Sequence, residues 1–509
     1  MSGTLRWQDL ELRMRPHWPE ILTLVFALAW IFHRASAQSI TLDEATTYHY
    51  WVAAGTPTHW EPHSNNHVLN STLMRLSIWL FGLSGLTARA PALLGGTIYM
   101  LAVYGLCRLL VSAGLLRWVL IVCFIYNPFI MDYLVAARGY GLALGFLMLA
   151  IFLFARVVVK ERSQRDVRRH LMAISACVGL AICANFSFAY ASTALLVVAA
   201  AFAGVMLFRQ GCGALALGRL AVACALPALA VTVVLAGSAL TRFPRDQLFW
   251  GVNSLAESWH DIRHACFDEL NPYLFNPLLA SGFETLQQYV FPALAVVGAA
   301  YLGLFILDRR RRRDSRTILA ECLTTVLALT VLAHWLQFKL FKIPLPYERT
   351  SIFVVPLATA LVAAVLSAST FDWKGRAVRT CGVGILLFSG LHFIGELRDS
   401  HFREWRNCAD IKAAFPVLAD LCRRAGVREV VSDLNFTGSF NFYRDVFKAT
   451  EMDELANFDP PPPGKTIYVL MNGVAGDFIR KEGLQVYWHG LATDLVIAVS
   501  PGTMVTVRP

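Results

Sequence analysis

Long apolar stretches separated by shorter polar segments fill most of the chain up to about residue 400. A helix needs about 20 mostly apolar residues to cross the hydrocarbon core of a bilayer. About eleven stretches come close to this length, and we predict one transmembrane helix in each: residues 18–37, 89–110, 118–131, 140–159, 171–185, 188–208, 220–240, 285–307, 317–338, 351–370 and 381–397. The hydrophobic pattern therefore predicts an α-helical polytopic membrane protein.

The basic residues give this bundle an orientation. Lys and Arg concentrate in residues 156–169, 309–316 and 374–379, and these three segments lie on one side of the predicted membrane. Because cytoplasmic loops carry the excess of Lys and Arg, we assign that side to the cytoplasm. Every loop obeys the rule under this assignment, which places the N-terminus inside and the segment after the last span outside.

The opposite face carries the longer polar segments. Two of them are large loops, at residues 38–88 and 241–284, and both belong to a predicted membrane domain of residues 1–398. Residues 399–509 are long enough for a small external soluble domain. Their pattern predicts helices at 410–425 and 474–482, and strands at 427–432, 466–470, 495–499 and 504–507. An external α/β domain is therefore expected.

Composition agrees with a membrane location. Hydrophobic residues make up 56% of the chain and charged residues 16%, against about 45–50% and about 25% in soluble domains. The 45 Lys and Arg exceed the 35 Asp and Glu, but the excess lies in short runs between apolar stretches rather than in one patch. An ordinary soluble enzyme and a nucleic-acid-binding protein are excluded, and membrane lipids are expected partners.

Two adjacent carboxylates, Asp43 and Glu44, follow the first predicted span directly. Ionisable residues at a membrane boundary are costly to dehydrate and mark functional sites by default. Alternatively, Thr41 or Asp43 caps a helix that lies along the interface, with an aromatic belt formed by Tyr48, Tyr50 and Trp51. Capping alone leaves unexplained why the loop stays polar and rich in histidine as far as residue 67.

The order of several short motifs around this acidic pair is informative. They are LNSTLMRL at 69–76, LFG at 80–82, ARAP at 88–91, AARGY at 136–140 and PYER at 346–349, with Pro356 in the following span. Together with the acidic pair, they resemble the GT-C glycosyltransferases, in the branch of protein O-mannosyltransferases and lipid A aminoarabinose transferases. One departure is NNHVLN at 65–70, where many members have a Pro-Pro-Leu turn in a loop that contacts acceptors.

The resemblance implies a GT-C fold in a bacterial inner membrane, with the C-terminal domain on the periplasmic or extracellular side. It also implies a donor sugar carried on polyprenyl phosphate and an external acceptor, which is a lipid, a glycan or a protein. Asp43 is implied as the base that takes the proton of the acceptor hydroxyl, with inversion at the anomeric carbon. Glu44 then orients Asp43, shares the proton or helps to hold a divalent cation, and no other cofactor is expected. Like-charge repulsion between neighbouring carboxylates can raise one pKa, which suits a base.

Cations are needed where the departing lipid phosphate gathers negative charge. For this role we predict Arg138 and Arg349, helped by Lys339, Lys342 and Tyr347. Gly139 beside Arg138 would let a headgroup approach the backbone. The alternative is that both arginines extend to lipid headgroups, as interfacial arginines commonly do.

Sugar rings pack on aromatic side chains, while their hydroxyls bond to acids, amides and imidazoles. The two long external loops supply such residues, and we predict sugar or acceptor contacts from His59, Glu61, His63, Asn65, Asn66, His67, Trp250, Trp259 and His260. His260 and His264 also have the helical spacing of metal ligands, but no third ligand accompanies them, so no metal site is predicted.

Two other functions compete with an inverting transferase. A transporter or flippase of lipid-linked saccharides would place charges or broken helices near mid-bilayer, whereas the predicted spans hold few ionisable residues. A polysaccharide polymerase or ligase would differ in its donor, and the residues leave that alternative open.

Overall fold

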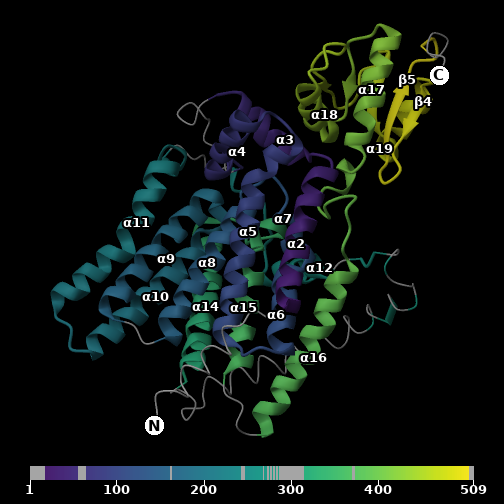
Figure 1. Cartoon of the computed structure of the whole chain (residues 1–509). Helices are drawn as coiled ribbons and strands as arrows, with labels where there is room; N and C mark the ends of the chain where they lie inside the picture. Colours follow the sequence, from purple (N-terminus) through teal and green to yellow (C-terminus); the bar gives the residue numbers. More distant parts are fainter. Residues whose placement is uncertain are drawn as a thin grey trace.

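The computed structural model describes residues 18–55, 63, 65–160, 163–241, 247–267, 269–271, 314–368 and 373–503, with isolated positions between 274 and 285. A large helical bundle is followed by a smaller domain of helices and strands at its C-terminal end (Figure 1). All but the first residue of the predicted span at 285–307, the predicted strand at 504–507, and the predicted contacts His59 and Glu61 lie outside the described residues.

Within the described ranges, eight helical segments are long and apolar enough to cross a membrane. Six are the helices α2 Trp18–Ala37, α5 Gly85–Leu110, α8 Tyr140–Val159, α9 Gln164–Ala184, α11 Ala214–Thr241 and α14 Ser315–Phe341. The other two join a short 3-10 turn to a helix: η2 Phe186–Phe188 with α10 Ala189–Arg209, and η4 Glu348–Ser351 with α15 Val354–Ser367. Shorter apolar helices include α4 Val68–Phe81, α6 Leu115–Ile125 and the later part of α16 Trp373–Gly395. The predicted helical multi-pass membrane protein is confirmed.

The predicted span at 118–131 is not one continuous helix. Helix α6 ends at Ile125, and a short helix, α7, runs over Pro128–Tyr133. Asn127 has an extended backbone and caps α7 by accepting a hydrogen bond from Ile130 N at 3.3 Å. A residue before proline is disfavoured in the helical region, which explains the break.

Close packing of α5 on α8 sets the position of the chain that precedes α8. A Cβ on Gly95 would lie 2.3 Å from the carbonyl carbon of Gly141, and one on Gly145 would lie 2.4 Å from the carbonyl oxygen of Gly95. Small residues let helix backbones approach this closely inside membranes. The approach brings residues 136–139 beside the first loop.

The segment after α2 is helical over much of its described length. Helix α3 covers Leu42–Thr47 and continues into a π-helix, η1, over Tyr48–Ala53. Thr41 is the N-cap, since its side chain accepts from Glu44 N while Glu44 Oε2 accepts from Thr41 N. The capped helix predicted here is confirmed, with Thr41 as its cap. In the later loop, α12 covers Leu255–Cys266.

The C-terminal domain contains a five-stranded mixed sheet in the order β2-β1-β3-β5-β4. Strand β1 pairs in parallel with β2 and β3, while β5 pairs antiparallel with β3 and β4. The strands are β1 Val431–Ser432, β2 Ala456–Asn457, β3 Ile467–Met471, β4 Gln485–His489 and β5 Leu495–Val499, and the helices are α17 Ile411–Ala425, α18 Leu434–Phe447 and α19 Asn472–Lys481. The predicted α/β character is confirmed, and α17 ends at Gly426 with a φ of 64° as expected.

Helix α18 and strands β2 and β4 were not predicted. The aromatic residues Phe436, Phe440, Phe442 and Tyr443 are all buried, and such residues favour strands more than helices in an isolated sequence. Tertiary packing against α3 and α17 decides the helical conformation instead.

Helix α18 docks the domain onto the first loop (Figure 1). The backbone N–H of Ile40 donates to the hydroxyl of Tyr443 at 3.0 Å, and His49 Nε2 lies 3.1 Å from the carbonyl oxygen of Gly438. The Ser39 hydroxyl donates to the carbonyl of Ala409 at 2.6 Å. Helix α3, which carries the acidic pair, is thus held between the bundle and the C-terminal domain.

Candidate functional site

Glu44 is buried in a saturated hydrogen-bond network. Its Oε1 accepts from Arg89 Nε at 2.8 Å and from Ala137 N at 2.6 Å. Its Oε2 accepts from Arg89 Nη2 at 2.7 Å and from Thr41 N at 2.8 Å. Four hydrogen bonds engage the acceptor positions of a carboxylate. Of the three predicted roles of Glu44, this geometry favours orientation, because the network fixes the start of α3 and the peptide before Arg138.

Asp43 faces a different set of partners. Its Oδ2 lies 2.8 Å from Nη1 of Arg349, and both side chains are 16% exposed. Its backbone carbonyl accepts from Arg138 Nη1 at 3.1 Å. The predicted base and the two predicted phosphate-binding arginines therefore meet at one place.

Arg138 is fully buried, although it carries a charge. It donates to Thr47 Oγ1 at 2.9 Å and to Asn65 Oδ1. Within the described part of the chain, its Nε has no hydrogen-bond partner. A buried guanidinium whose Nε–H has no hydrogen-bond acceptor is suited to bind an anion.

Gly139 allows this arrangement by its lack of a side chain. A Cβ at this position would lie 1.7 Å from the carbonyl oxygen of Ala184 and 2.9 Å from Cβ of His67. No larger residue fits between the start of α8 and these neighbours without a shift of the backbone. The glycine predicted for headgroup approach thus serves close packing.

Arg349, in η4, lies between two aromatic rings and two carboxylates. Its guanidinium carbon is 5.7 Å from the ring centroids of both Trp250 and Trp405. Besides Asp43, it pairs with Oε1 of Glu404. We call Asp43, Arg138, Arg349 and Glu404 the carboxylate–guanidinium cluster.

Glu404 follows the last helix of the bundle and also accepts a hydrogen bond from the hydroxyl of Tyr133 at Oε2. Burial raises the pKa of Glu404 to about 7, with smaller upward contributions from the charges of Glu348 and Asp43. Arg349 and the Tyr133 hydrogen bond act in the opposite direction. Glu404 therefore changes charge near neutral pH.

His67 and two tyrosines line the cluster. The His67 ring centroid lies 5.3 Å from that of Tyr140, which lies 4.8 Å from that of Tyr133. Burial, with the nearby charges of Arg138 and Arg349, holds the pKa of His67 well below its usual range. His67 is therefore a neutral polar group at neutral pH.

Helix α12 holds the turn that carries Arg349. Asp261 Oδ2 accepts from Glu348 N at 2.6 Å, and the Ser258 hydroxyl donates to the carbonyl of Pro346 at 2.7 Å. Val252 and Leu345 also form an isolated β-bridge. These contacts explain why residues 250–261 and 345–349 converge, although they are distant in sequence.

Several predicted contacts lie at or near the cluster. Asn65 bonds to Arg138, and Trp250 packs on Arg349. The Tyr347 ring centroid is 6.4 Å from that of Trp250. Asn66 is buried and accepts from Ser71, and the His63 ring centroid lies 5.9 Å from that of Trp51.

Four other predicted residues that the structure describes lie away from the cluster. Lys339 is exposed near the end of α14, with its Nζ 5.9 Å and 5.5 Å from the ring centroids of Trp335 and Phe338. Lys342 is the exposed C-cap of the same helix, with a φ of 59°. Trp259 and His260 are exposed on α12. These four side chains are outside the immediate surroundings of Asp43 and Arg349.

Sequence reasoning missed Glu404, Tyr133 and Trp405. Tyr133 follows Asp132 just after the predicted span at 118–131, and Glu404 precedes Trp405 shortly after the last predicted span. An acid beside an aromatic residue just outside a span was the available signal, whereas the first loop was singled out by two adjacent carboxylates. Glu404 and Tyr133 are 271 positions apart in the chain, so only the fold unites them.

In the described part of the site, guanidinium and backbone donors engage the carboxylates. Among the described residues, no group of three or more His, Cys, Asp or Glu side chains is placed to hold a metal ion. The oxygens of Glu44 are engaged by four donors, and Arg349 lies against both Asp43 and Glu404. Arg349 thus bridges the carboxylates of Asp43 and Glu404.

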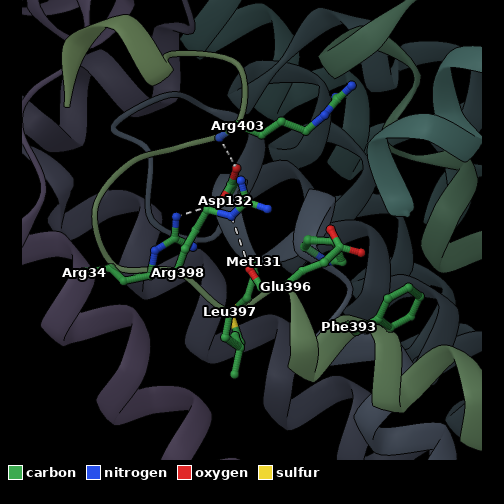
Figure 2. Close-up of a pocket in the computed structure, with 9 residues that line it drawn as sticks. Arg34, Met131, Asp132, Phe393, Glu396, Leu397, Arg398 and Arg403 are labelled. Atoms are coloured by element: carbon green, nitrogen blue, oxygen red, sulfur yellow. Dashed lines mark hydrogen bonds and ion pairs between the residues drawn. The ribbon is translucent and has the colours of Figure 1, made fainter. Parts of the chain in front are cut away.

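A pocket adjoins the cluster through two pairs of neighbouring residues. Figure 2 shows Asp132 and Arg403 in this pocket, together with Arg34 and Arg398. Asp132 accepts from Arg34 Nη2 at 2.6 Å and from the backbone N–H of Arg403 at 2.8 Å. These bonds fix residues 132 and 403, and so also the neighbouring Tyr133 and Glu404 of the cluster.

No protein-family model and no curated protein sequence matches the chain. Among solved structures, ArnT from Cupriavidus metallidurans in the apo state is 13% identical, with a TM-score of 0.51 over 96% of this chain and 98% of that one. ArnT bound to undecaprenyl phosphate, also 13% identical, gives a TM-score of 0.47 over 94% and 97% of the two chains. The oligosaccharyltransferase AglB from Archaeoglobus fulgidus, in complex with an inhibitory peptide and a dolichol-phosphate, is 12% identical, with a TM-score of 0.40 over 87% of this chain and 64% of its own.

The likeness to apo ArnT extends over nearly the whole of both chains and shows a common fold. The predicted fold, a bundle of membrane helices followed by a small C-terminal α/β domain, is therefore confirmed, and the chain shares it with ArnT.

Proposed function

We propose that this protein is a glycosyltransferase that moves a sugar from a polyprenyl-phosphate carrier to an acceptor hydroxyl, with inversion at the anomeric carbon. The observation that carries the proposal is the carboxylate–guanidinium cluster. A candidate base, Asp43, lies in contact with Arg349 and Arg138, two guanidiniums suited to a phosphate. The GT-C fold and the motif order support the same reaction class.

In the proposed reaction, Asp43 takes the proton of the acceptor hydroxyl as its oxygen bonds to the anomeric carbon. The bond from that carbon to the phosphate oxygen breaks, and its electron pair stays on the phosphate. Arg349 and Arg138 stabilise the negative charge that gathers there. For the sugar ring to lie between the base and the phosphate, the 2.8 Å contact of Asp43 with Arg349 must open on donor binding.

Other residues around the cluster are proposed to bind the sugar or the acceptor. Trp250 offers an aromatic face that is 51% exposed, and Asn65 and His67 offer polar groups near Arg138. Trp259 and His260, which are exposed on α12, are proposed to contact the acceptor rather than the reacting atoms. The proposed acceptor is a lipid, a glycan or a protein.

The protein is a multi-pass membrane protein. We place it in a bacterial inner membrane with a cytoplasmic N-terminus, on the distribution of Lys and Arg between its loops. The cluster, the long loops and a soluble domain of residues 399–509 then face the periplasm or the exterior. Polyprenyl-phosphate sugars would reach Arg349 from the membrane, and membrane lipids would surround the bundle.

The deciding experiment is an assay of the purified protein with a panel of polyprenyl-phosphate sugars, with products identified by mass spectrometry. Release of polyprenyl phosphate together with a glycosylated acceptor supports the proposal. Movement of a lipid-linked saccharide across vesicles without bond cleavage would instead support a transporter or flippase. Turnover only with diphosphate-linked glycans would support a polymerase or ligase.

A further inference from the structure

Glu404 reaches the cluster from a part of the chain outside the membrane bundle. It lies between α16 and α17, in the segment that leads into the C-terminal domain. Its side chain is 19% exposed, and its two oxygens have different partners, Arg349 at Oε1 and the hydroxyl of Tyr133 at Oε2. The reaction proposed above assigns it no role.

The charge of Glu404 affects how well the cluster can bind a phosphate. The cluster holds two guanidiniums and two carboxylates. Arg349 pairs with the carboxylates of both Asp43 and Glu404, and Arg138 donates to the backbone carbonyl of Asp43. With all four ionised, their formal charges cancel. A sugar phosphodiester would add one negative charge beside Arg349, where an ionised Glu404 already takes up part of the guanidinium and repels a second anion.

We infer that Glu404 is the acid on the phosphate side of the site: its carboxyl group is protonated when the carrier phosphate is bound at Arg349, and it donates a hydrogen bond to a phosphate oxygen. This inference rests on the proposed function. No net proton transfer is required at Glu404, because the acceptor proton goes to Asp43 and the electron pair of the broken bond stays on the phosphate. The neutral acid stabilises that charge as a hydrogen-bond donor.

The contacts of Glu404 favour this role. Tyr133 donates to Oε2, so that oxygen is the acceptor and Oε1 is the place for a proton. A proton on Oε1 removes the charge that holds Arg349 there and frees the guanidinium for phosphate. Burial raises the pKa of Glu404 to about 7, so the proton is accessible near neutral pH.

The chain on both sides of Glu404 keeps the carboxyl group in place. The backbone N–H of Arg403 donates to Asp132 at 2.8 Å, and the ring centroids of Trp405 and Tyr133 are 5.7 Å apart (Figure 2 shows the contact of Arg403). The titratable and charged groups that act on Glu404 come from four neighbouring elements: Asp43, Tyr133, Tyr140, Glu348 and Arg349.

The test is the binding of undecaprenyl phosphate to the full-length protein in detergent between pH 6 and pH 9, for the wild type and Glu404→Gln. The amide of Gln mimics the protonated carboxyl group, because it is neutral at every pH in this range. With a pKa of about 7, only about one tenth of wild-type molecules hold the proton at pH 8, so Glu404→Gln should bind about tenfold more tightly there and equally at pH 6. Calorimetry in buffers of different ionisation enthalpy should show that wild-type binding at pH 8 takes up nearly one proton more than binding by the variant.

A second variant keeps the test independent of how well Glu404→Gln folds. Tyr133→Phe removes a hydrogen bond that favours the ionised form of Glu404, so the loss of binding should move to higher pH. Glu269→Gln is the matched control. Glu269 is an exposed carboxylate that lies 3.9 Å from Arg406, and Arg406 is two residues after Glu404. This control should keep the wild-type pH profile.

The outcomes separate the two proposals. If wild type and Glu404→Gln bind undecaprenyl phosphate with the same pH profile and proton uptake, the role of Glu404 is refuted while the transferase proposal stands. An unchanged midpoint in Tyr133→Phe also counts against Glu404. If the wild type fails to bind undecaprenyl phosphate at any pH, the proposed function itself fails, and this inference with it.

Discussion

Arg89 on α5 binds Glu44 on α3 through two buried hydrogen bonds, from Nε to Oε1 at 2.8 Å and from Nη2 to Oε2 at 2.7 Å. The remaining Arg89 donors reach the carbonyls of Ala35, Gln38 and Ser39 between 2.7 and 3.1 Å. One guanidinium therefore fixes both the end of α2 and the start of the helix that carries Asp43.

Arg89→Ala is expected to destabilise the protein strongly, because it leaves Glu44 buried without its counter-charge. Removing one partner of a buried ion pair costs about 3–5 kcal/mol. Thermal unfolding in detergent should show a lower Tm. The exposed pair of Arg428 with Asp453, at 2.8 Å, supplies the control: Arg428→Ala should change the Tm little. Equal effects of the two substitutions would contradict a structural role for Arg89.

Asp43→Asn should abolish sugar transfer and leave the fold intact. The amide keeps the size of the side chain and loses the ability to accept the acceptor proton, which costs roughly 100- to 10,000-fold in rate. Transfer rates and undecaprenyl phosphate binding, measured on the same preparation, separate loss of the base from loss of the site. Asp453→Asn, at an exposed position of the C-terminal domain, is the control. Wild-type turnover by Asp43→Asn would refute the assignment of the base.

Arg138→Ala and Arg349→Ala should weaken use of the donor more than use of the acceptor. Each removes hydrogen bonds to a charged group, worth about 1.5–3 kcal/mol, or roughly 10- to 100-fold in the donor kcat/KM. Lys339→Ala should change the same quantity much less, because Lys339 is exposed and packs on Trp335 and Phe338. A larger loss of donor kcat/KM for Lys339→Ala than for Arg349→Ala would indicate that the phosphate binds near the end of α14.

Parts of this fold are predictable because local pattern and tertiary structure agree. The bounds of α2 and α8 match the predicted stretches at 18–37 and 140–159, since an apolar run of that length has few alternatives to a spanning helix. Helix α17 carries its own end signal in Gly426. Asp43, Arg138 and Arg349, which the fold brings together, were proposed because each stands near the end of a predicted span within one of the short motifs.

What escaped prediction depends on contacts between distant parts of the chain. Glu404 and Tyr133 meet across 271 positions, and no local pattern pairs them. Lys342 was predicted to help Arg349 at the phosphate, and the structure places it as the exposed C-cap of α14. A helix end and the following turn direct their side chains differently, so closeness in sequence does not bring Lys342 to Arg349.

Gly139→Ala should impair the site through packing alone. Its new methyl group would lie 1.7 Å from the carbonyl oxygen of Ala184, so the backbone that carries Arg138 must shift. A displacement of about 1 Å in positioning groups can cost about 100-fold in rate, so transfer should fall steeply. Gly204→Ala in α10 is the matched control, because a Cβ there meets nothing within 4 Å and alanine favours the helix. Transfer rates and Tm values of both variants test the argument, and wild-type activity in Gly139→Ala would show that Arg138 does not depend on this close contact.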